Sequence, residues 1–268
     1  MRLQIRRHKC LLHHLYLYPS NSLVKFFFSS CTLTATTKNV LPRPSFLKIE
    51  KQLLVTMCHP KKKDYCINRE FGASASGVVV HSHGSNSYAL TAAHVCVDSQ
   101  AKKMLRHYRH KMRFFVINID NKPFHIEVVA VDTVNDLCIL YVWGLDATPI
   151  RISRKAPKPA DRVYNMAAPI GIFDKNMIPI FDGFYNGDAG KHAIYSLPAR
   201  GGSSGSPIMN EKGELIGMIS SVFVHFPQIL MSPKFQVTRD FIKKQVKADM
   251  QKKQIMRLIN FLRKISLG

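Results

Sequence analysis

The chain has 268 residues, enough for one large domain or two small ones with a buried core. Hydrophobic residues make up 46% of it, a globular value that excludes a wholly disordered polyelectrolyte. The formal net charge of +22 comes from three basic stretches, since the rest of the chain is neutral: residues 1–49, 100–113 and 234–268.

Residues 1–56 differ in composition from the chain that follows. They are basic, rich in Ser, Thr and Leu, and without regular hydrophobic periodicity. Their apolar patch at Leu23–Phe28 contains Lys25 and is too short to span a bilayer or to make a good secretory signal. We expect a poorly ordered leader, serving either as an organellar targeting segment or as an extension upstream of a start at Met57.

From residue 67 the pattern becomes one of short strands separated by turns. Two hairpins and a further strand are predicted at Gly77–Val80 with Tyr88–Thr91, Met112–Ile119 with Phe124–Val131, and Leu137–Trp143. After a connector at 144–158, a second set is predicted at Val163–Ala167, Met177–Phe184, His192–Leu197, Pro207–Met209 and Leu215–Val224. Many short strands without intervening helices predict an all-β fold of two antiparallel barrels, at about 67–146 and 159–233.

Residues 236–268 are predicted to form a basic amphipathic α-helix. Thr238 is placed to cap it. Apolar residues that fall near one stripe of this helix are Phe241, Ile242, Val246, Ile255, Ile259, Leu262 and Ile265. We expect the stripe to pack against a barrel, with docking to a partner or to a membrane as the alternative for the distal half.

Three motifs carry chemistry. His94 follows Thr91-Ala92-Ala93, Asp136 precedes an apolar strand, and Ser204 lies in the glycine-rich loop Gly201–Pro207. A neutral imidazole with a pKa of about 6.5 suits removal of a serine proton near neutral pH. A carboxylate orients that imidazole, and a glycine loop aims consecutive backbone N–H groups at one developing oxyanion. The wide spacing suits a base and an acid from one barrel and a nucleophile from the other.

In these motifs the chain resembles the trypsin/chymotrypsin superfamily of serine proteases, especially its compact HtrA-like, bacterial and viral branches. The resemblance covers roughly residues 67–235 and implies a chymotrypsin-like double barrel in a peptidase domain at 57–235. It implies His94 as general base, Asp136 as its orienter and Ser204 as nucleophile. The N–H groups of Gly202 and Ser204 would form the oxyanion hole. Relatives often end in a helix packed on the second barrel.

Local alternatives exist for each motif. Asp132 competes with Asp136, but the apolar strand that follows favours Asp136. Ser203 matches a nucleophile elbow, but Pro207 and the turn after it cannot supply the helix that this motif needs. A metal site from His81, His83 and His94 lacks a convincing further ligand, so no metal or organic cofactor is expected.

Departures from the family pattern narrow the expected specificity. Ser203 stands where zymogens of the trypsin type have an aspartate, so activation by that ion pair is not expected. Pro198, six residues before Ser204, is not acidic, which disfavours cleavage after Lys or Arg. We expect the substrate pocket to include Ser220, Ser221, Val222 and His225, the last facing an acidic side chain.

Six cysteines give no decisive pattern. No C-x-x-C spacing indicates zinc. In digestive relatives a cysteine directly follows the histidine, whereas here Val95 intervenes before Cys96, so that disulfide is not assumed. Cys138 is interpreted as a small buried residue, which slightly favours a reducing, intracellular compartment.

The sequence therefore predicts a serine endopeptidase that acts on polypeptides. The alternative is an inactive protease-fold protein that uses its basic surfaces for binding. Residues 100–113 and 234–268 are the stretches that would contact an anionic partner, nucleic acid or membrane. Their few aromatic residues argue against a base-stacking platform.

Overall fold

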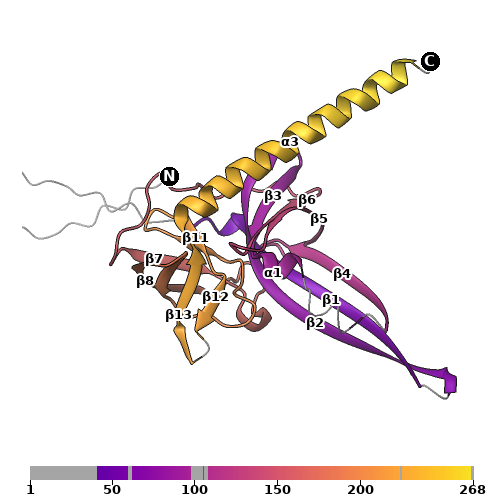
Figure 1. Ribbon diagram of the computed structural model, residues 1–268, viewed down its shortest axis with the longest axis horizontal. Coiled ribbons are helices and arrows are strands. Elements are labelled where there is room, and N and C mark those ends of the chain that lie inside the picture. Colours follow the sequence, from indigo (N-terminus) through magenta and orange to yellow (C-terminus); the bar gives the residue numbers. More distant parts are fainter. Residues whose placement is uncertain (1–40, 60–61, 98–104, 106–107, 224, 267–268) are drawn as a thin grey trace, which may run out of the picture. The chain divides into compact units, whose positions relative to one another are not determined.

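The computed structural model describes residues 41–59, 62–97, 105, 108–223 and 225–266. In this part, two antiparallel β units are followed by a long C-terminal helix (Figure 1). The first unit is a closed barrel with the strand order β1-β2-β3-β6-β5-β4. Its strands are β1 (Phe46–His59), β2 (Lys62–His83), β3 (Asn86–Thr91), β4 (Arg109–Ile117), β5 (Pro123–Asp132) and β6 (Leu137–Val142).

The first strand was not expected. Phe46, Leu47 and Ile49 are at most 1% exposed in the barrel core, so the prediction of a poorly ordered leader is wrong for residues 46–56. The alternation of buried and exposed side chains that marks a strand covers only a few residues here. The charged residues Lys48 and Glu50, which form a salt bridge of 2.6 Å, obscure it in the sequence. The remainder of the expected leader, residues 1–40, lies outside the described residues.

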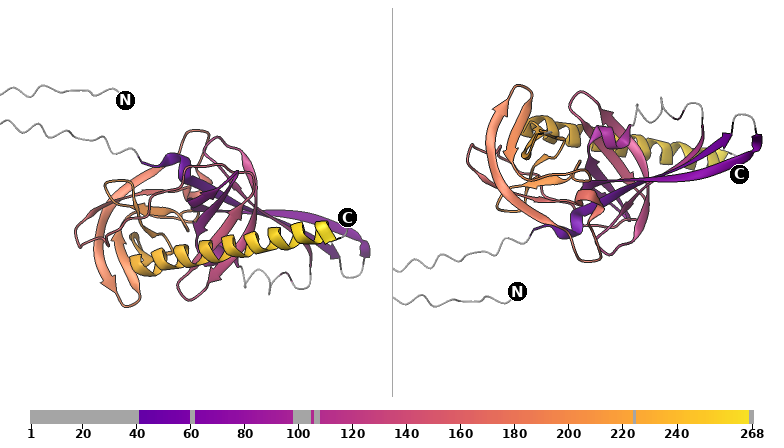
Figure 2. Two further views of the ribbon diagram at one scale, coloured as in Figure 1. Left: turned by 90° about the horizontal axis from the view of Figure 1, so that it is seen from above. Right: turned by 90° about the horizontal axis from the view of Figure 1, so that it is seen from below.

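Beyond the barrel, β1 and β2 continue as a long hairpin, with β4 paired along the other edge of β1 (Figures 1 and 2). The β1–β2 pairing runs from Phe46 opposite Val78 to Cys58 opposite Cys66. These two cysteines form a disulfide. The hairpin therefore stays in register almost to its tip.

The second unit is a seven-stranded sheet with the order β11-β10-β7-β8-β9-β13-β12. Its strands are β7 (Arg162–Met166), β8 (Ile180–Ala189), β9 (His192–Ser196), β10 (Pro207–Met209), β11 (Leu215–Met218), β12 (Ser221–Phe223) and β13 (Phe226–Pro233). The strand expected at Leu215–Val224 is thus two strands, and β13 was not expected. The all-β, chymotrypsin-like double-barrel class with a C-terminal helix is confirmed.

Short helical turns precede or connect the strands in the described ranges. They are η1 (Arg43–Ser45), α1 (Ala93–Cys96) and η3 (Pro169–Gly171). The turn α1 carries one of the predicted catalytic residues, and η3 lies beside the glycine-rich loop, since the N–H of Ile170 donates to the carbonyl of Gly201. The turns α1 and η3 therefore belong to the site and not to the barrel walls.

Helix α3 (Phe235–Ser266) packs its first half on β5 and β6 of the first barrel and on β11 of the second unit, against a core to which both units contribute. Ile242 and Val246 join that core, and the Tyr88 hydroxyl donates a hydrogen bond of 2.9 Å to Asp249. The resemblance implies packing on the second barrel; the helix does contact β11 of that unit, and Phe235 joins the second core, but it also packs on β5 and β6 of the first barrel. Figure 2 shows the helix lying along the strands from two sides.

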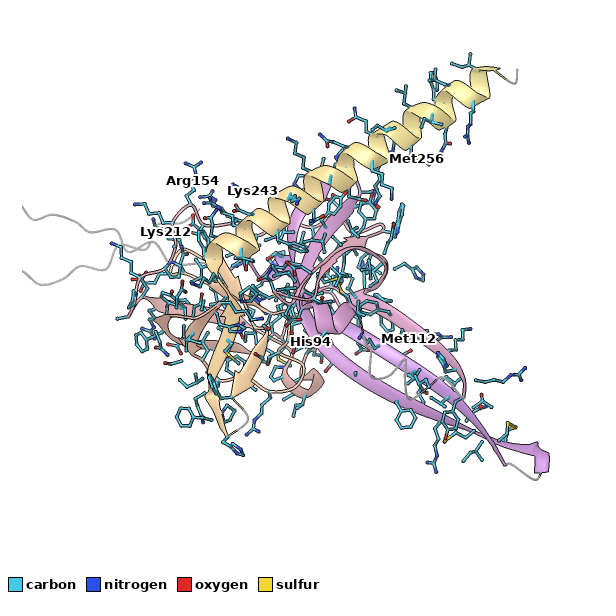
Figure 3. All side chains as sticks on the ribbon, viewed as in Figure 1. His94, Met112, Arg154, Lys212, Lys243 and Met256 are labelled. Atoms are coloured by element: carbon cyan, nitrogen blue, oxygen red, sulfur yellow. A yellow bond between two sulfur atoms is a disulfide. The ribbon has the colours of Figure 1, made fainter. Side chains whose placement is uncertain are left out.

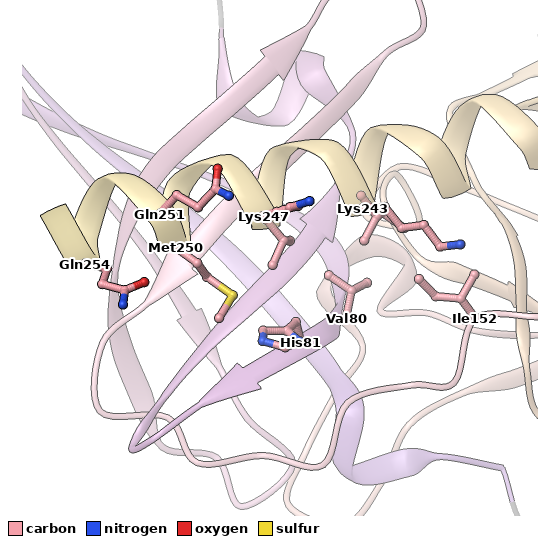
Figure 4. A pocket seen from close by; sticks show the side chains of 10 residues that line it. Val80, His81, Ile152, Lys243, Lys247, Met250, Gln251 and Gln254 are labelled. Atoms are coloured by element: carbon pink, nitrogen blue, oxygen red, sulfur yellow. The ribbon is translucent and has the colours of Figure 1, made fainter.

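The start of α3 also differs from expectation. The helix begins at Phe235, and the N–H of Thr238 already donates to the carbonyl of Lys234, so Thr238 lies inside the first turn and does not cap it. Farther along, the helix roofs a cavity of about 420 Å³ whose lining includes Val80, His81 and Met250 (Figure 4). In the described part of the chain, no helix is long and apolar enough to cross a bilayer.

Candidate active site

His94 lies where the two β units meet (Figure 3). It follows strand β3 and sits in the single turn α1. Thr91, Ala92 and Ala93 are all buried, whereas the His94 side chain is 52% exposed. Small buried residues thus anchor the turn while the imidazole faces outward into solvent.

The carboxylate of Asp136 is the hydrogen-bond partner of this imidazole. The Nδ1 atom of His94 lies 3.0 Å from both carboxylate oxygens, and the backbone N–H of His94 donates to Oδ1 at 3.0 Å. An ionised carboxylate only accepts hydrogen bonds, so Nδ1 carries the proton and Nε2 of the neutral ring is left as an acceptor. Asp136 occupies this position in a left-handed backbone conformation, with φ of 56°.

Ser220 is a third donor to Asp136. Its hydroxyl donates to Oδ2 at 2.5 Å across the gap between the two β units. Burial tends to raise the pKa of Asp136, but the hydrogen bonds from His94 and Ser220 outweigh it and hold that pKa below its ordinary value. Ser220, expected as part of the substrate pocket, is thereby engaged with the carboxylate.

Asp132, the local rival of Asp136, is occupied elsewhere. Its carboxylate accepts hydrogen bonds from the backbone N–H groups of Val134 and Asn135 and from the Asn135 amide. Burial raises its pKa, but the Asn135 and Val134 donors lower it by more. Asp132 therefore holds the turn that presents Asp136.

Ser76 fastens the glycine-rich loop to the first barrel. Its backbone N–H donates to the Ser204 carbonyl at 2.8 Å, and its hydroxyl donates to the Gly202 carbonyl at 2.8 Å. The same hydroxyl accepts from the N–H of Ala168 at 3.0 Å. Sequence reasoning missed Ser76, because a buried serine in a β-strand carries no local signal of such contacts.

Two glycines of the loop are required by space and by backbone conformation. Gly202 has φ of 96°, and a Cβ there would lie 2.4 Å from the Ala168 carbonyl oxygen. Gly205 has φ of 84°, and a Cβ there would lie 2.2 Å from both the Ser76 carbonyl oxygen and Thr91 Oγ1. The Ser204–Gly205 segment thus lies directly against the strand end that precedes His94.

The backbone of this loop leaves two donors open. Among the described residues, neither the N–H of Gly202 nor that of Ser204 has a hydrogen-bond acceptor, whereas the N–H of Ser203 donates to Arg200. Ser203 itself is 1% exposed, which removes it from contact with a substrate. Ser204 is partly exposed, and in this part of the chain no hydrogen bond joins its hydroxyl to His94.

The remaining predicted pocket residues lie on the second unit. Ser221 and Val222 belong to β12, the edge strand next to β13, while Pro198 and His225 are exposed in the loops after β9 and β12. In the described part of the chain, none of these four residues forms a hydrogen bond or an ion pair with the His94 imidazole or with Ser204.

His81 and His83 do not assemble with His94. His81 lies against the Tyr88 ring at 6.0 Å between centroids, and burial, followed by the charge of His83, lowers its pKa. Within the described ranges no cluster of three or more His, Cys, Asp or Glu side chains is suited to a metal ion.

A disulfide joins the histidine and aspartate segments. Cys96 in α1 and Cys138 in β6 are bonded, two residues after His94 and Asp136 respectively. Cys138 is buried, as expected, but it is a disulfide partner and not merely a small buried residue. Strand β6 pairs with β3, which brings Thr91 opposite Cys138, and this pairing could not be read from the spacing.

Comparison with known proteins identifies the family of the chain and solved structures of similar fold. Residues 75–218 match the family model described as a trypsin-like peptidase domain, and the chain belongs to this family. The serine endoprotease from Yersinia pestis is similar in structure, with a TM-score of 0.56 and 17% identity over 77% of this chain. The HtrA-type protease AlgW with a decapeptide gives a TM-score of 0.60 and 15% identity over 76% of this chain.

These structural likenesses define a serine protease fold. The chain matches 64% and 65% of the lengths of the two solved proteins. No curated protein sequence matches the chain.

Proposed function

We propose that the protein is a serine endopeptidase that cleaves polypeptides through an acyl-enzyme on Ser204. One observation carries the proposal: the Asp136 carboxylate fixes the His94 tautomer, leaving Nε2 as a proton acceptor on the side open to solvent. The two open N–H groups beside Ser204 add the second requirement of acyl transfer, a place for the oxyanion.

In the proposed reaction, Ser204 Oγ attacks the peptide carbonyl carbon while its proton passes to Nε2 of His94. The carbonyl oxygen becomes an oxyanion that accepts hydrogen bonds from the N–H groups of Gly202 and Ser204. The C–N bond then breaks, and the imidazolium returns the proton to the leaving amine. Water repeats the sequence on the ester, releasing the acid and restoring Ser204. Asp136 stays ionised and stabilises the imidazolium throughout.

The test uses a fluorophosphonate probe, which reacts only with an activated serine. We expect the full chain to be labelled, Ser204→Ala to be unlabelled, and the buried neighbour variant Ser203→Ala to retain labelling. Equal labelling of Ser204→Ala and the parent chain would place the nucleophile elsewhere. A folded parent chain that is never labelled would favour the inactive, binding-only alternative.

For specificity, we propose a substrate pocket lined by Pro198, Ser221, Val222 and His225, with Ser220 committed to Asp136. An imidazole at His225 favours an acidic side chain before the cut, and the lack of an acid at Pro198 disfavours Lys or Arg. Cleavage of a mixed peptide library by the parent chain and by His225→Ala tests this. Identical preferences in both would remove His225 from the pocket.

An anionic partner is a separate proposal. Most of residues 100–113, from 100 to 107, lies outside the described residues except Leu105. The stretch 234–268 is almost entirely helix α3, so the structure supports a proposal about partners there and not in the first stretch.

A further inference from the structure

Helix α3 carries two apolar stripes, not the single one expected from the sequence. In its first half, Ile242 and Val246 are buried in the larger core, to which both β units contribute, with Met250 packed against it. In its second half a group of apolar side chains is 37% to 63% exposed. These residues are Ile255, Leu258, Ile259, Phe261, Leu262 and Ile265.

The two stripes lie on opposite sides of the helix. At 3.6 residues per turn, the nine residues from Val246 to Ile255 cover about two and a half turns, which reverses the direction of the side chain. Leu258, Ile259 and Leu262 follow Ile255 at helical spacing and keep its side. Phe261, fifteen residues after Val246, lies about 60° from Val246 around the helix and is not part of this stripe. The distal stripe therefore points away from the core that holds the proximal one, and its residues are exposed in the described part of the chain.

On the barrel-facing side the distal half is basic instead. Lys253 lies 4.0 Å from the Tyr141 ring centroid and forms an ion pair with Asp249. Arg257 lines the same small cavity as Lys253. After Asp249 the sequence has five Lys and Arg residues and no acid. The distal half is thus an exposed amphipathic helix with purely cationic charge.

We propose that residues 251–266 of α3 form a docking surface for an anionic lipid bilayer. The apolar stripe is of the kind that enters the boundary between headgroups and acyl chains, and the Lys and Arg residues match the charge of acidic headgroups. Figure 1 shows this half of the helix continuing beyond β3, β5 and β6.

Charge and hydrophobicity favour a lipid bilayer over a second copy of the chain and over a nucleic acid as the partner of this surface. A second copy of the chain would bring two acid-free helix halves together within proteins of net charge +22, which is unfavourable. A nucleic acid would satisfy the basic residues but would leave the isoleucine and leucine stripe in water. A bilayer with acidic lipids takes up the apolar stripe, and Lys252 and Arg263, about 60° and 80° from Ile255 around the helix, flank it on the side of the headgroups.

The first experiment measures co-sedimentation of the full chain with vesicles of phosphatidylcholine alone or mixed with phosphatidylserine. We expect binding to the mixed vesicles, at least about tenfold weaker binding to phosphatidylcholine alone, and loss with rising salt. Leu258→Gln with Leu262→Gln should weaken binding to mixed vesicles at least about tenfold. The matched control, Ile180→Gln with Phe184→Gln, removes similarly exposed apolar side chains from β8 and should bind as the parent does.

The second experiment reports which side of the helix enters the lipid. The chain has one tryptophan, Trp143, so Trp143→Phe provides a dark background. In that background Leu262→Trp should shift its emission to the blue when mixed vesicles are added. Asn260→Trp, nearly opposite on the helix, should show no shift.

Several separate results would contradict the proposed docking to a bilayer. Absence of binding to mixed vesicles, equal binding of the Leu258/Leu262 variant, or a blue shift from position 260 instead of 262 would each overturn the proposal. So would a stripe-dependent dimer in sedimentation, or retention on a DNA duplex that exceeds vesicle binding and ignores the leucine substitutions. None of these readouts depends on Ser204, so failure here leaves the proposed peptidase activity untouched.

Discussion

Asp136 combines a strained backbone with three hydrogen-bond donors. Its φ of 56° is uncommon for a residue with a side chain, and short polar residues tolerate it best. This conformation places the carboxylate where the His94 ring, the His94 backbone and Ser220 all donate to it. The resulting low pKa keeps the group ionised over the range in which an imidazole acts as a base.

The low pKa of Asp136 makes the free energy of unfolding depend on pH in the acid range. A carboxylate whose pKa is lower in the folded chain stabilises the fold above its ordinary value of 3.8, and this stabilisation is lost as pH falls through the folded pKa. We therefore expect Asp136→Asn to lose less unfolding free energy than the parent chain between pH 6 and pH 3. Urea unfolding at both pH values measures the difference; equal losses would show that Asp136 does not carry this dependence.

A second residue-scale prediction concerns Gly205. Gly205→Ala would place a methyl group 2.2 Å from backbone and side-chain atoms at a positive φ, so we expect a loss of at least about 3 kcal/mol of unfolding free energy. Gly201→Ala is the control, because nothing lies within 4 Å of a Cβ there. Urea titrations compare the two. Similar stabilities would mean that the loop moves away from Thr91.

Sequence patterns located His94, Asp136 and Ser204 because each sits in a motif with a local signature. Ser76 and Ser220 were harder to assign. Their hydroxyls act across the gap between the two β units, and the partners lie 126 and 84 positions away in the chain. Such contacts follow from tertiary pairing and leave no periodicity or spacing to read.

At the scale of elements, the Cys96–Cys138 disulfide ties α1 to the start of β6. It closes a segment of 42 residues, and the chain-entropy account gives about 4 kcal/mol for a loop of that size. We expect Cys96→Ala with Cys138→Ala to lower the unfolding free energy by about that amount. Cys58→Ala with Cys66→Ala, which opens a separation of 8, should cost only about 2.5 kcal/mol. The reverse order in denaturant unfolding would contradict the loop-length argument.

The two stripes of α3 make a further prediction at this scale. Ile242 is 3% exposed, so Ile242→Ala should cost about 3 kcal/mol of unfolding free energy. Ile255 is 57% exposed, so Ile255→Ala should change it by less than about 0.5 kcal/mol. Thermal or urea unfolding of the two variants measures both costs. A comparable cost at both positions would mean that the distal stripe is buried by the chain itself.

The sequence pattern merged these stripes because it contained enough apolar residues to suggest one continuous face. Helical spacing gives the angle between the two halves, but only burial shows which side packs on the core, since Ile242 and Ile255 are equally apolar. A similar limit applied to β1, where alternating Leu47 and Ile49 were hidden among charged neighbours. Hairpins bounded by Gly84–Asn86 and Asp120–Pro123 were predicted well, because their turns are local.

At the scale of the whole molecule, the candidate active site is assembled from both β units. The first supplies His94 and Asp136, and the second supplies the glycine-rich loop. The hydroxyl of Ser76 bridges them, donating to Gly202 and accepting from Ala168 while being fully buried. The relative placement of the units is therefore coupled to the backbone that flanks Ser204.

Ser76→Ala tests that coupling. It leaves the Gly202 carbonyl and the Ala168 N–H without their shared partner, so we expect a loss of about 1–3 kcal/mol of unfolding free energy. If the peptidase proposal holds, kcat should fall at least about tenfold with KM nearly unchanged, because the oxyanion donors shift while the pocket does not. Ser87→Ala is the matched control: Ser87 is equally buried and donates to the Leu145 carbonyl at 2.7 Å within the first unit. It should lose similar stability and keep kcat, and an equal fall in kcat for both variants would assign the effect to general loosening of the barrel.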